Sequence, residues 1–357
     1  MNLFRRHFAA LLPIAILLTA AACTGSPDPE PSLPPVPTET TSTTIPTTTA
    51  PKYGKNPLTG IEDMQTDNNR PIGFVVTDES STLTQLYLET ADLYFEAETE
   101  AGIPRILAIY SSIDRIPERI GPVRSARPHF VKIAQALDCI YCHIGGSSTG
   151  LDTIRALGVD DLANAYETDP VLKQSKNFSW NRSAFTREKV LAAVSRNRYR
   201  LTGEHDRSPY QFGSKTGTSP ATTVNVKLSE AYDMAFTYDA ASGLYQKHRN
   251  ALSTPVHTTA TGGTITASNI IVMFDRRTVD EMYTDSKGHQ TPRYDFDLKS
   301  GSGLLASGGT SRPIHWERSA GGLQFWEEDG TTPLTVATGK TFICLASDTL
   351  KSRTSIT

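Results

Sequence analysis

Residues 93–112 read LYFEAETEAGIPRILAIYSS, and this stretch decides the fold class. Apolar residues dominate two short runs, Leu93–Glu98 and Arg105–Ser112, and the turn-forming residues Gly102–Pro104 separate them. Apolar runs of this length, bounded by glycine and proline, are typical of buried β-strands. We therefore expect two consecutive strands joined by a short turn.

The segments on either side alternate strands with helices. Pro71–Thr77 and Cys139–Ile144 are further apolar runs of strand length. Helices are expected over Ser81–Glu89, Pro128–Leu137, Leu151–Leu157 and Thr186–Asn197. Strands that alternate with helices predict a mixed or parallel sheet covered by helices.

The pattern changes near Gly213–Pro220. From there, short apolar runs are separated by Gly, Asp, Ser and Asn turns, as in a mainly antiparallel β structure. The expected strands are Thr222–Leu228, Met234–Tyr238, Tyr245–His248, Ile270–Phe274, Tyr294–Leu298, Gly303–Ala306, His315–Arg318 and Thr341–Ala346. The sequence therefore predicts an α+β protein. An α/β domain with a mixed sheet covered by helices spans residues 57–205, and a smaller, mainly antiparallel β domain spans residues 206–350.

The first 22 residues have the features of a signal peptide. Arg5 and Arg6 precede an apolar run from Phe8 to Ala22, which is short for a membrane span and ends in three alanines. Cys23 follows at the expected cleavage point, as in the lipobox of bacterial lipoproteins. We expect the Cys23 sulfur to carry the lipid, so that acyl chains anchor the protein in the membrane.

A tether is expected after this cysteine, over residues 23–56. Thr24–Lys52 consists almost entirely of Pro, Thr, Ser and acidic residues, which cannot bury a core. Extended, the tether reaches up to ~90 Å from the membrane. The predicted location is the extracytoplasmic face of the cell membrane. A formal net charge of −3 provides no basic field for nucleic acid.

Three segments resemble the YerB-like lipoproteins, the DUF3048 family. They are FEAETEAGIPR at 95–105, IGPVRSAR at 120–127 and DCIYCHIGGS at 138–147. The segments SGSGLLASGG at 300–309 and GKTFICL at 339–345 are similar to the family's second domain. The resemblance extends from about Pro57 to Ala346 and implies an exported lipoprotein with an α/β N-terminal domain and a β-rich C-terminal domain. It implies no particular activity.

Glu96, Glu100, Arg105, Arg124 and Arg127 form the best candidate cluster for chemistry. The glutamates lie at a strand end, and Arg124 and Arg127 lie in a loop before a helix. Paired guanidinium groups at a helix N-terminus suit a carboxylate or phosphate. The cluster therefore predicts an anion-binding or acid–base crevice, with Glu96 and Glu100 as the catalytic candidates. A structural salt-bridge network is the alternative.

His143, Ser147 and Asn177 are candidates to line the same crevice. His143 and Ser147 lie at the end of the Cys139–Ile144 strand, where α/β sheets place ligands. Each also has an ordinary structural explanation: a hydrogen-bonded core histidine, a serine of the glycine turn, or an asparagine that caps a loop.

Cys139, Cys142 and His143 spell the Cys-x-x-Cys-His signal for haem attachment. That chemistry requires accessible thiols, whereas this run predicts a buried strand. We expect no cofactor and no metal. Unpaired core cysteines are the favoured interpretation, although a disulfide from Cys344 to Cys139 or Cys142 remains open.

Three functions remain open on the sequence. The first is binding of a cell-envelope ligand, such as peptidoglycan or an anionic polymer, in the Glu/Arg crevice. The second is cleavage of cell-wall glycan with a single glutamate as general acid. The third is a scaffold without catalysis that binds an envelope protein partner.

Overall fold

The two strands expected from residues 93–112 lie in the middle of a mixed, 11-stranded sheet. The computed structural model describes residues 54–64, 67–79, 85–163, 165–168, 183–203, 208–284 and 287–357. In order across the sheet the strands are β12 (Ser219–Pro220), β21 (Thr310–Ser319), β20 (Ser300–Ser307), β17 (Asn269–Asp275), β24 (Thr341–Ser347), β4 (Leu93–Glu98), β5 (Pro104–Tyr110), β3 (Ile72–Thr77), β7 (Ile140–Cys142) and β8 (Asp161–Leu162), with β22 (Gly322–Glu327) paired to β21. The protein has an α+β fold.

A second sheet and several small ones accompany it. The five-stranded sheet has the order β16 (Thr266–Ala267), β15 (Leu244–Lys247), β14 (Asp233–Asp239), β13 (Thr223–Lys227) and β25 (Ser355–Ile356). The small sheets are β1 (Gly54–Lys55) with β2 (Glu62–Met64), β6 (Arg119–Ile120) with β10 (Ser183–Thr186) and β9 (Tyr166–Thr168), β11 (Gln211–Phe212) with β23 (Thr335–Val336), and β18 (Arg277–Thr284) with β19 (Gln290–Phe296).

The helices are α1 (Pro128–Ala136), α2 (Ser148–Leu157) and α3 (Arg187–Asn197), with 3₁₀ helices at Leu88–Thr90, Ile113–Arg115 and Asp348–Arg353. The helix α2 begins three residues earlier than expected, because the Ser147 side chain accepts a hydrogen bond from the Gly150 amide and caps it. Of the helix expected over Ser81–Glu89, residues 81–84 lie outside the described residues, and residues 85–87 are not helical; only the 3₁₀ turn that begins at Leu88 is found. None of the described helices combines the length and apolar composition that a membrane crossing requires.

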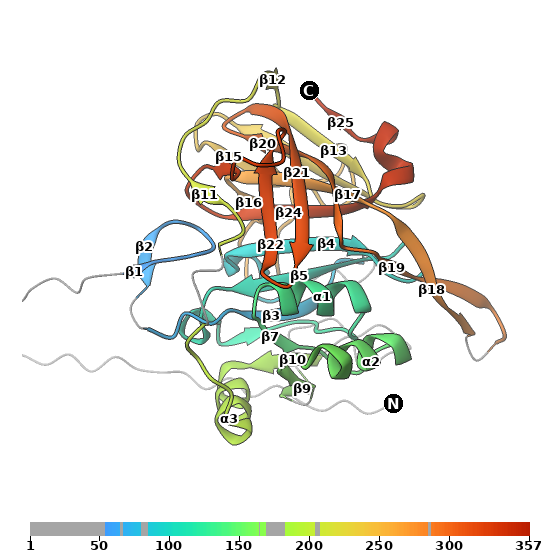
Figure 1. Cartoon of the computed structure of the whole chain (residues 1–357). Coiled ribbons are helices and arrows are strands. Elements are labelled where there is room, and N and C mark those ends of the chain that lie inside the picture. Colours follow the sequence, from blue (N-terminus) through green and yellow to red (C-terminus); the bar gives the residue numbers. More distant parts are fainter. Residues whose placement is uncertain are drawn as a thin grey trace, which may run out of the picture. The chain divides into compact units, whose positions relative to one another are not determined.

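β24, the last strand of the central sheet in chain order, lies inside the sheet and joins segments that are far apart in the sequence. β24 pairs in parallel with β17 on one side and with β4 on the other. The sheet therefore runs without interruption across the sequence boundary near residues 200–222. The described residues, from Gly54 to Thr357, belong to one structural unit (Figure 1).

The register of β4 on β5 decides which side chains share a face. Glu96 pairs with Ile106, and Ala97 pairs with Arg105. Because neighbouring residues of a strand point to opposite faces, Glu96 and Arg105 lie on opposite sides of the sheet. On the Glu96 side, Ile106 belongs to a hydrophobic core that the five-stranded sheet covers. On the Arg105 side, Ala97 belongs to a second hydrophobic core that α1 covers.

The hairpin of β18 and β19 extends as an arm away from the two large sheets (Figure 1). The arm carries three of the exposed large apolar side chains, Val279, Met282 and Tyr283. β18 was not expected from the sequence, because its exposed surface lacks the apolar face by which buried strands are identified.

Gly303 in β20 is required by close packing. A Cβ atom at this position would lie 2.4 Å from the Val272 carbonyl oxygen of the neighbouring strand. We expect Gly303→Ala to lower the free energy of unfolding by about 1–3 kcal/mol, as overpacking does elsewhere. Urea unfolding measures the loss. Gly54→Ala is the control, since its Cβ would meet nothing closer than 3.5 Å. Equal stability of the two variants would contradict the close packing.

Candidate functional site

The loop of residues 121–127 is fixed to the sheet by its backbone. The Arg124 amide donates to the Val75 carbonyl at 2.7 Å, and the Val123 amide donates to the Ser183 carbonyl at 2.9 Å. The Ile144 amide in turn donates to the Arg124 carbonyl at 3.0 Å. These bonds fix the backbone from which the arginine side chains of the loop project, beside the ends of β3 and β7.

Glu100 lies between two of these guanidinium groups. Arg127 donates from Nε at 2.9 Å and from Nη2 at 2.7 Å to Glu100 Oε2, and Arg105 forms an ion pair with Oε1. Burial would raise the pKa of Glu100, but the Arg105 and Arg127 charges outweigh it and lower the pKa to about 2. Glu100 is therefore a permanent carboxylate. We refer to Glu100, Arg105, Arg124 and Arg127 as the arginine cluster.

Burial shifts the pKa of two arginines in the arginine cluster. Burial, together with repulsion from Arg127, lowers the pKa of Arg105 to about 9, and burial lowers the pKa of Arg124 to about 10. Both remain cations near neutral pH. Arg127 is also the N-cap residue of α1 and its side chain makes no capping hydrogen bond, so the helix dipole adds to the positive potential. Arg105 and Arg127 thus share the Glu100 carboxylate, whereas the carboxylates that act on Arg124 are Glu79 and Glu100.

Tyr141 adds a hydrogen-bond donor to this region. Its hydroxyl is buried, and the Arg127 backbone amide and the charges of Arg127 and Arg105 lie close enough to act on it. Burial raises the pKa of Tyr141, so the hydroxyl keeps its proton. A buried hydroxyl that keeps its proton beside two guanidinium groups is suited to an anionic ligand.

The side chains of His143 and Ser147 are engaged within the protein. His143 Nδ1 lies 2.7 Å from the Gly145 carbonyl oxygen, and Nε2 lies 3.0 Å from Asp161 Oδ2. Ser147 caps α2. The backbone nevertheless joins this turn to the arginine loop, because the Ala126 amide donates to the Gly145 carbonyl at 3.0 Å. Both residues therefore support the position of the arginine cluster.

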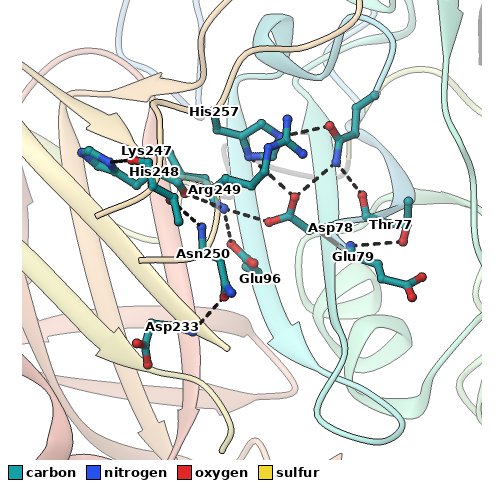
Figure 2. Close-up of polar contacts among 12 residues, drawn as sticks. Thr77, Asp78, Glu79, Glu96, Asp233, Lys247, His248, Arg249, Asn250 and His257 are labelled. Atoms are coloured by element: carbon teal, nitrogen blue, oxygen red, sulfur yellow. Dashed lines mark hydrogen bonds and ion pairs between the residues drawn. The ribbon is translucent and has the colours of Figure 1, made fainter. Parts of the chain in front are cut away.

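Glu96 corrects the expected site. It points to the opposite face of the sheet from Arg105, its exposed fraction is 2%, and it lies 3.4 Å from Lys247 Nζ (Figure 2). The expectation that Glu96 and Glu100 share one crevice is therefore wrong. The register of the strands separates them, although four positions along a continuous strand would have placed them on one face.

Asn177 and Cys23 lie outside the described residues. The three cysteines of the described part, Cys139, Cys142 and Cys344, are buried and free, as the favoured sequence interpretation had it. Their burial also removes the accessible thiols that the Cys-x-x-Cys-His signal would need.

Sequence reasoning missed three residues with unusual surroundings: Tyr141, Asp78 and Lys247. Tyr141 occurs in an apolar run, where a polar hydroxyl is a weak signal. Asp78 directly follows the buried strand β3, a position at which a carboxylate can point into a sheet edge. Lys247 lies two residues after the buried Tyr245 and so faces the same side of β15, which is a signal for a buried lysine.

Comparison with known proteins agrees with the fold. Residues 58–200 match the family described as "Protein of unknown function (DUF3048) N-terminal domain", and residues 224–343 match the DUF3048 C-terminal domain. The chain is 27% identical over 304 residues to "Putative lipoprotein YerB" of Bacillus subtilis (strain 168), which covers 82% of this chain and 86% of that protein.

The crystal structure of YerB protein from Bacillus subtilis resembles this structure with a TM-score of 0.70 and 25% sequence identity, over 85% of this chain and 99% of that chain. The resemblance of the three N-terminal segments and the two C-terminal segments is thereby confirmed, and the chain belongs to the DUF3048 family, with both its N-terminal and its C-terminal domain.

Proposed function

We propose that this protein is an extracytoplasmic lipoprotein, anchored through Cys23, whose arginine cluster binds an anionic group of a cell-envelope polymer. The sequence supports the anchor through the signal peptide and the cysteine at its end. YerB, to which the chain is similar, is described in its name as a lipoprotein. The Pro/Thr-rich segment after Cys23 is long enough, when extended, to place the folded part of the protein within the cell wall.

One observation supports the binding proposal: the buried guanidinium groups of Arg105 and Arg127 share the carboxylate of Glu100, which is 21% exposed, at a helix N-terminus. Two buried cations that share one carboxylate favour an incoming anion as a second partner. The planar guanidinium fork suits phosphate and carboxylate groups, which peptidoglycan stem peptides and anionic wall polymers contain.

The same geometry argues against a glycan-cleaving enzyme that uses these glutamates. A general acid needs a proton near neutral pH, whereas the pKa of Glu100 is about 2. Glu96 does hold a raised pKa because of burial, but it points into the core between the two sheets, against Lys247, where a polymer has no access. Neither side chain meets both requirements of an acid catalyst, which are a proton and access to substrate.

Co-sedimentation of the detergent-solubilised full chain with purified cell walls tests the binding proposal. We expect the wild type to bind walls that carry anionic polymer, and Arg124→Gln to bind about tenfold more weakly, since a hydrogen bond to a charged group contributes roughly 1.5–3 kcal/mol. Arg155→Gln is the matched control, because Arg155 is 70% exposed and pairs only with its helix neighbour Asp152 among the contacts described. Equal binding by all three chains would contradict the proposal.

The arm formed by β18 and β19 supports the scaffold as a second candidate. Val279, Met282 and Tyr283 are exposed by 57%, 50% and 43% on a hairpin that lies outside the two large sheets. Exposed apolar patches of this kind often mark protein interaction sites. If Arg124→Gln leaves wall association intact and Met282→Glu abolishes it, the scaffold is the better account.

A further inference from the structure

A second cluster of ionisable groups lies in the core between the central sheet and the five-stranded sheet (Figure 2). We refer to Asp78, Glu96, Lys247 and His257 as the lysine cluster. Lys247 Nζ lies 2.8 Å from Asp78 Oδ2 and 3.4 Å from Glu96 Oε2. The lysine comes from β15, whereas the two carboxyl groups come from the end of β3 and from β4. The cluster therefore bridges two sheets.

The lysine cluster is sealed from solvent. Asp78 and Glu96 are each 2% exposed, Lys247 is 1% exposed, and His257 is fully buried. The Lys247 ammonium lies 5.9 Å from the centre of the Phe342 ring, so its surroundings are partly aromatic. Such surroundings penalise charged groups far more than a surface does.

Two carboxyl groups compete for one lysine, and the protons are shared unequally. Burial alone would raise the pKa of Asp78, but the Lys247 charge, with hydrogen bonds from Lys247 and Glu96, lowers it overall. Burial and the neighbouring Asp78 raise the pKa of Glu96 well above its usual value, so Glu96 keeps its proton. Burial lowers the pKa of His257 to about 3, so this imidazole is neutral. The resting cluster is a lysine–aspartate pair beside a neutral carboxylic acid.

Gln85 fixes the orientation of the Asp78 carboxyl group. Its Nε2 donates to Asp78 Oδ1 at 3.2 Å and to the Thr77 carbonyl at 2.9 Å. Oδ1 is thus held by an amide donor, while Oδ2 faces the lysine nitrogen. A fixed donor on a carboxyl oxygen stabilises the negative charge that develops there when a nucleophile adds to the carbon. Glu96 Oε2, which has no hydrogen-bond partner in the described part of the chain, faces the same nitrogen.

We propose that Lys247 and Asp78 condense to form an intramolecular isopeptide bond, with Glu96 as the group that relays the proton. Held in contact by the fold, the amine and the carboxyl group react as one molecule, which greatly raises their effective concentration. Asp78 and Glu96 raise the pKa of Lys247 despite its burial, so the pair rests charged, and the neutral amine that attacks forms when the lysine passes a proton to Asp78 within the contact.

The reaction balances without any added reagent. A proton passes from Nζ to Asp78, which leaves an amine beside a carboxylic acid. Nζ then bonds to Asp78 Cγ, and the Cγ–Oδ2 bond breaks. A second proton moves from Nζ to the leaving oxygen through Glu96, so that one water molecule departs and Glu96 recovers its proton. The product is a neutral amide in place of a buried ion pair.

Such a bond would join the end of β3 covalently to β15, and hence the N-terminal half of the chain to the C-terminal half. A cross-link between residues so far apart in the sequence restricts the unfolded chain, much as a disulfide does. A covalent tie of this kind needs no oxidant and does not respond to thiols.

Peptide mapping of the full-length wild type by mass spectrometry tests the proposal. We expect a branched peptide that contains both Asp78 and Lys247, lighter than the two linear peptides together by the mass of one water molecule. The Lys132–Asp295 pair is an internal control: its Nζ and Oδ2 are 2.6 Å apart, but both side chains are partly exposed. Peptides with Lys132 should be linear.

Two variants separate the chemistry from the fold. Lys247→Arg keeps the positive charge and cannot form the amide, and Glu96→Gln keeps a hydrogen-bonding group but cannot relay a proton; in both we expect only linear peptides. The proposal is overturned if wild-type Asp78 and Lys247 occur only in linear peptides after prolonged incubation at neutral pH. It is equally overturned if Lys132 and Asp295 are cross-linked to the same extent. Neither result depends on whether a variant folds.

Discussion

Lys247→Met is expected to lower the free energy of unfolding by about 3–5 kcal/mol, the loss found when one partner of a buried ion pair is removed. Methionine fills a similar volume, so packing changes little. The Asp78 carboxyl group, 2% exposed, is then left in the core without a positive partner. In the wild type, the Asp78 carboxylate is neutralised either by the lysine charge or by an amide bond. Lys247→Met abolishes both, so the loss has the same sign in either case.

Urea unfolding at neutral pH measures this loss. Lys189→Met is the control: Lys189 pairs with Glu167 at 3.0 Å, but both side chains are 45% exposed. Exposed pairs contribute roughly 0–1 kcal/mol, so this variant should unfold close to the wild type. A Lys247→Met chain as stable as the Lys189→Met chain would show that the lysine cluster is not a buried charge pair.

Glu100→Gln is expected to remove most of the acid sensitivity that the arginine cluster gives the protein. The pKa of Glu100 falls from 4.5 to about 2 on folding, which corresponds to about 3 kcal/mol of stability. Because the folded pKa is depressed, this contribution is fully present above pH 4.5 and is lost as the pH falls towards 2. Glutamine cannot supply it at any pH.

The measurement is the free energy of unfolding between pH 7 and pH 2. The variant should be about 3 kcal/mol less stable than the wild type at pH 7, and the two curves should converge below pH 4.5. The exposed Glu328 provides the control variant, Glu328→Gln, whose curve should follow that of the wild type. A gap between Glu100→Gln and the wild type that stays constant down to pH 2 would contradict the assigned ion pairs.

Local patterns in the sequence predicted the elements well but not their pairing. β4 has the bounds that its apolar run indicates, and α1 ends one residue before the expected helix end. The order of strands could not be read in the same way, because β24 reaches β4 from almost 250 residues away in the chain. Such pairings depend on tertiary packing, which a single sequence does not encode locally.

The candidate site could be predicted only in part, again because strand pairing depends on tertiary packing. Glu100, Arg105 and Arg127 were expected together and lie together. Glu96 was assigned to the same crevice because it is near in sequence. The register, in which Ala97 and not Glu96 faces the side of Arg105, depends on the turn after β4 and cannot be derived from composition or spacing.

Calorimetric titration of the detergent-solubilised full chain with inorganic phosphate tests the anion site most directly. The account predicts saturable binding by the wild type, weaker at high salt, and a roughly tenfold loss of affinity in Arg124→Gln but not in Arg155→Gln. Absence of saturable binding by the wild type, or equal affinities in all three chains, would contradict it.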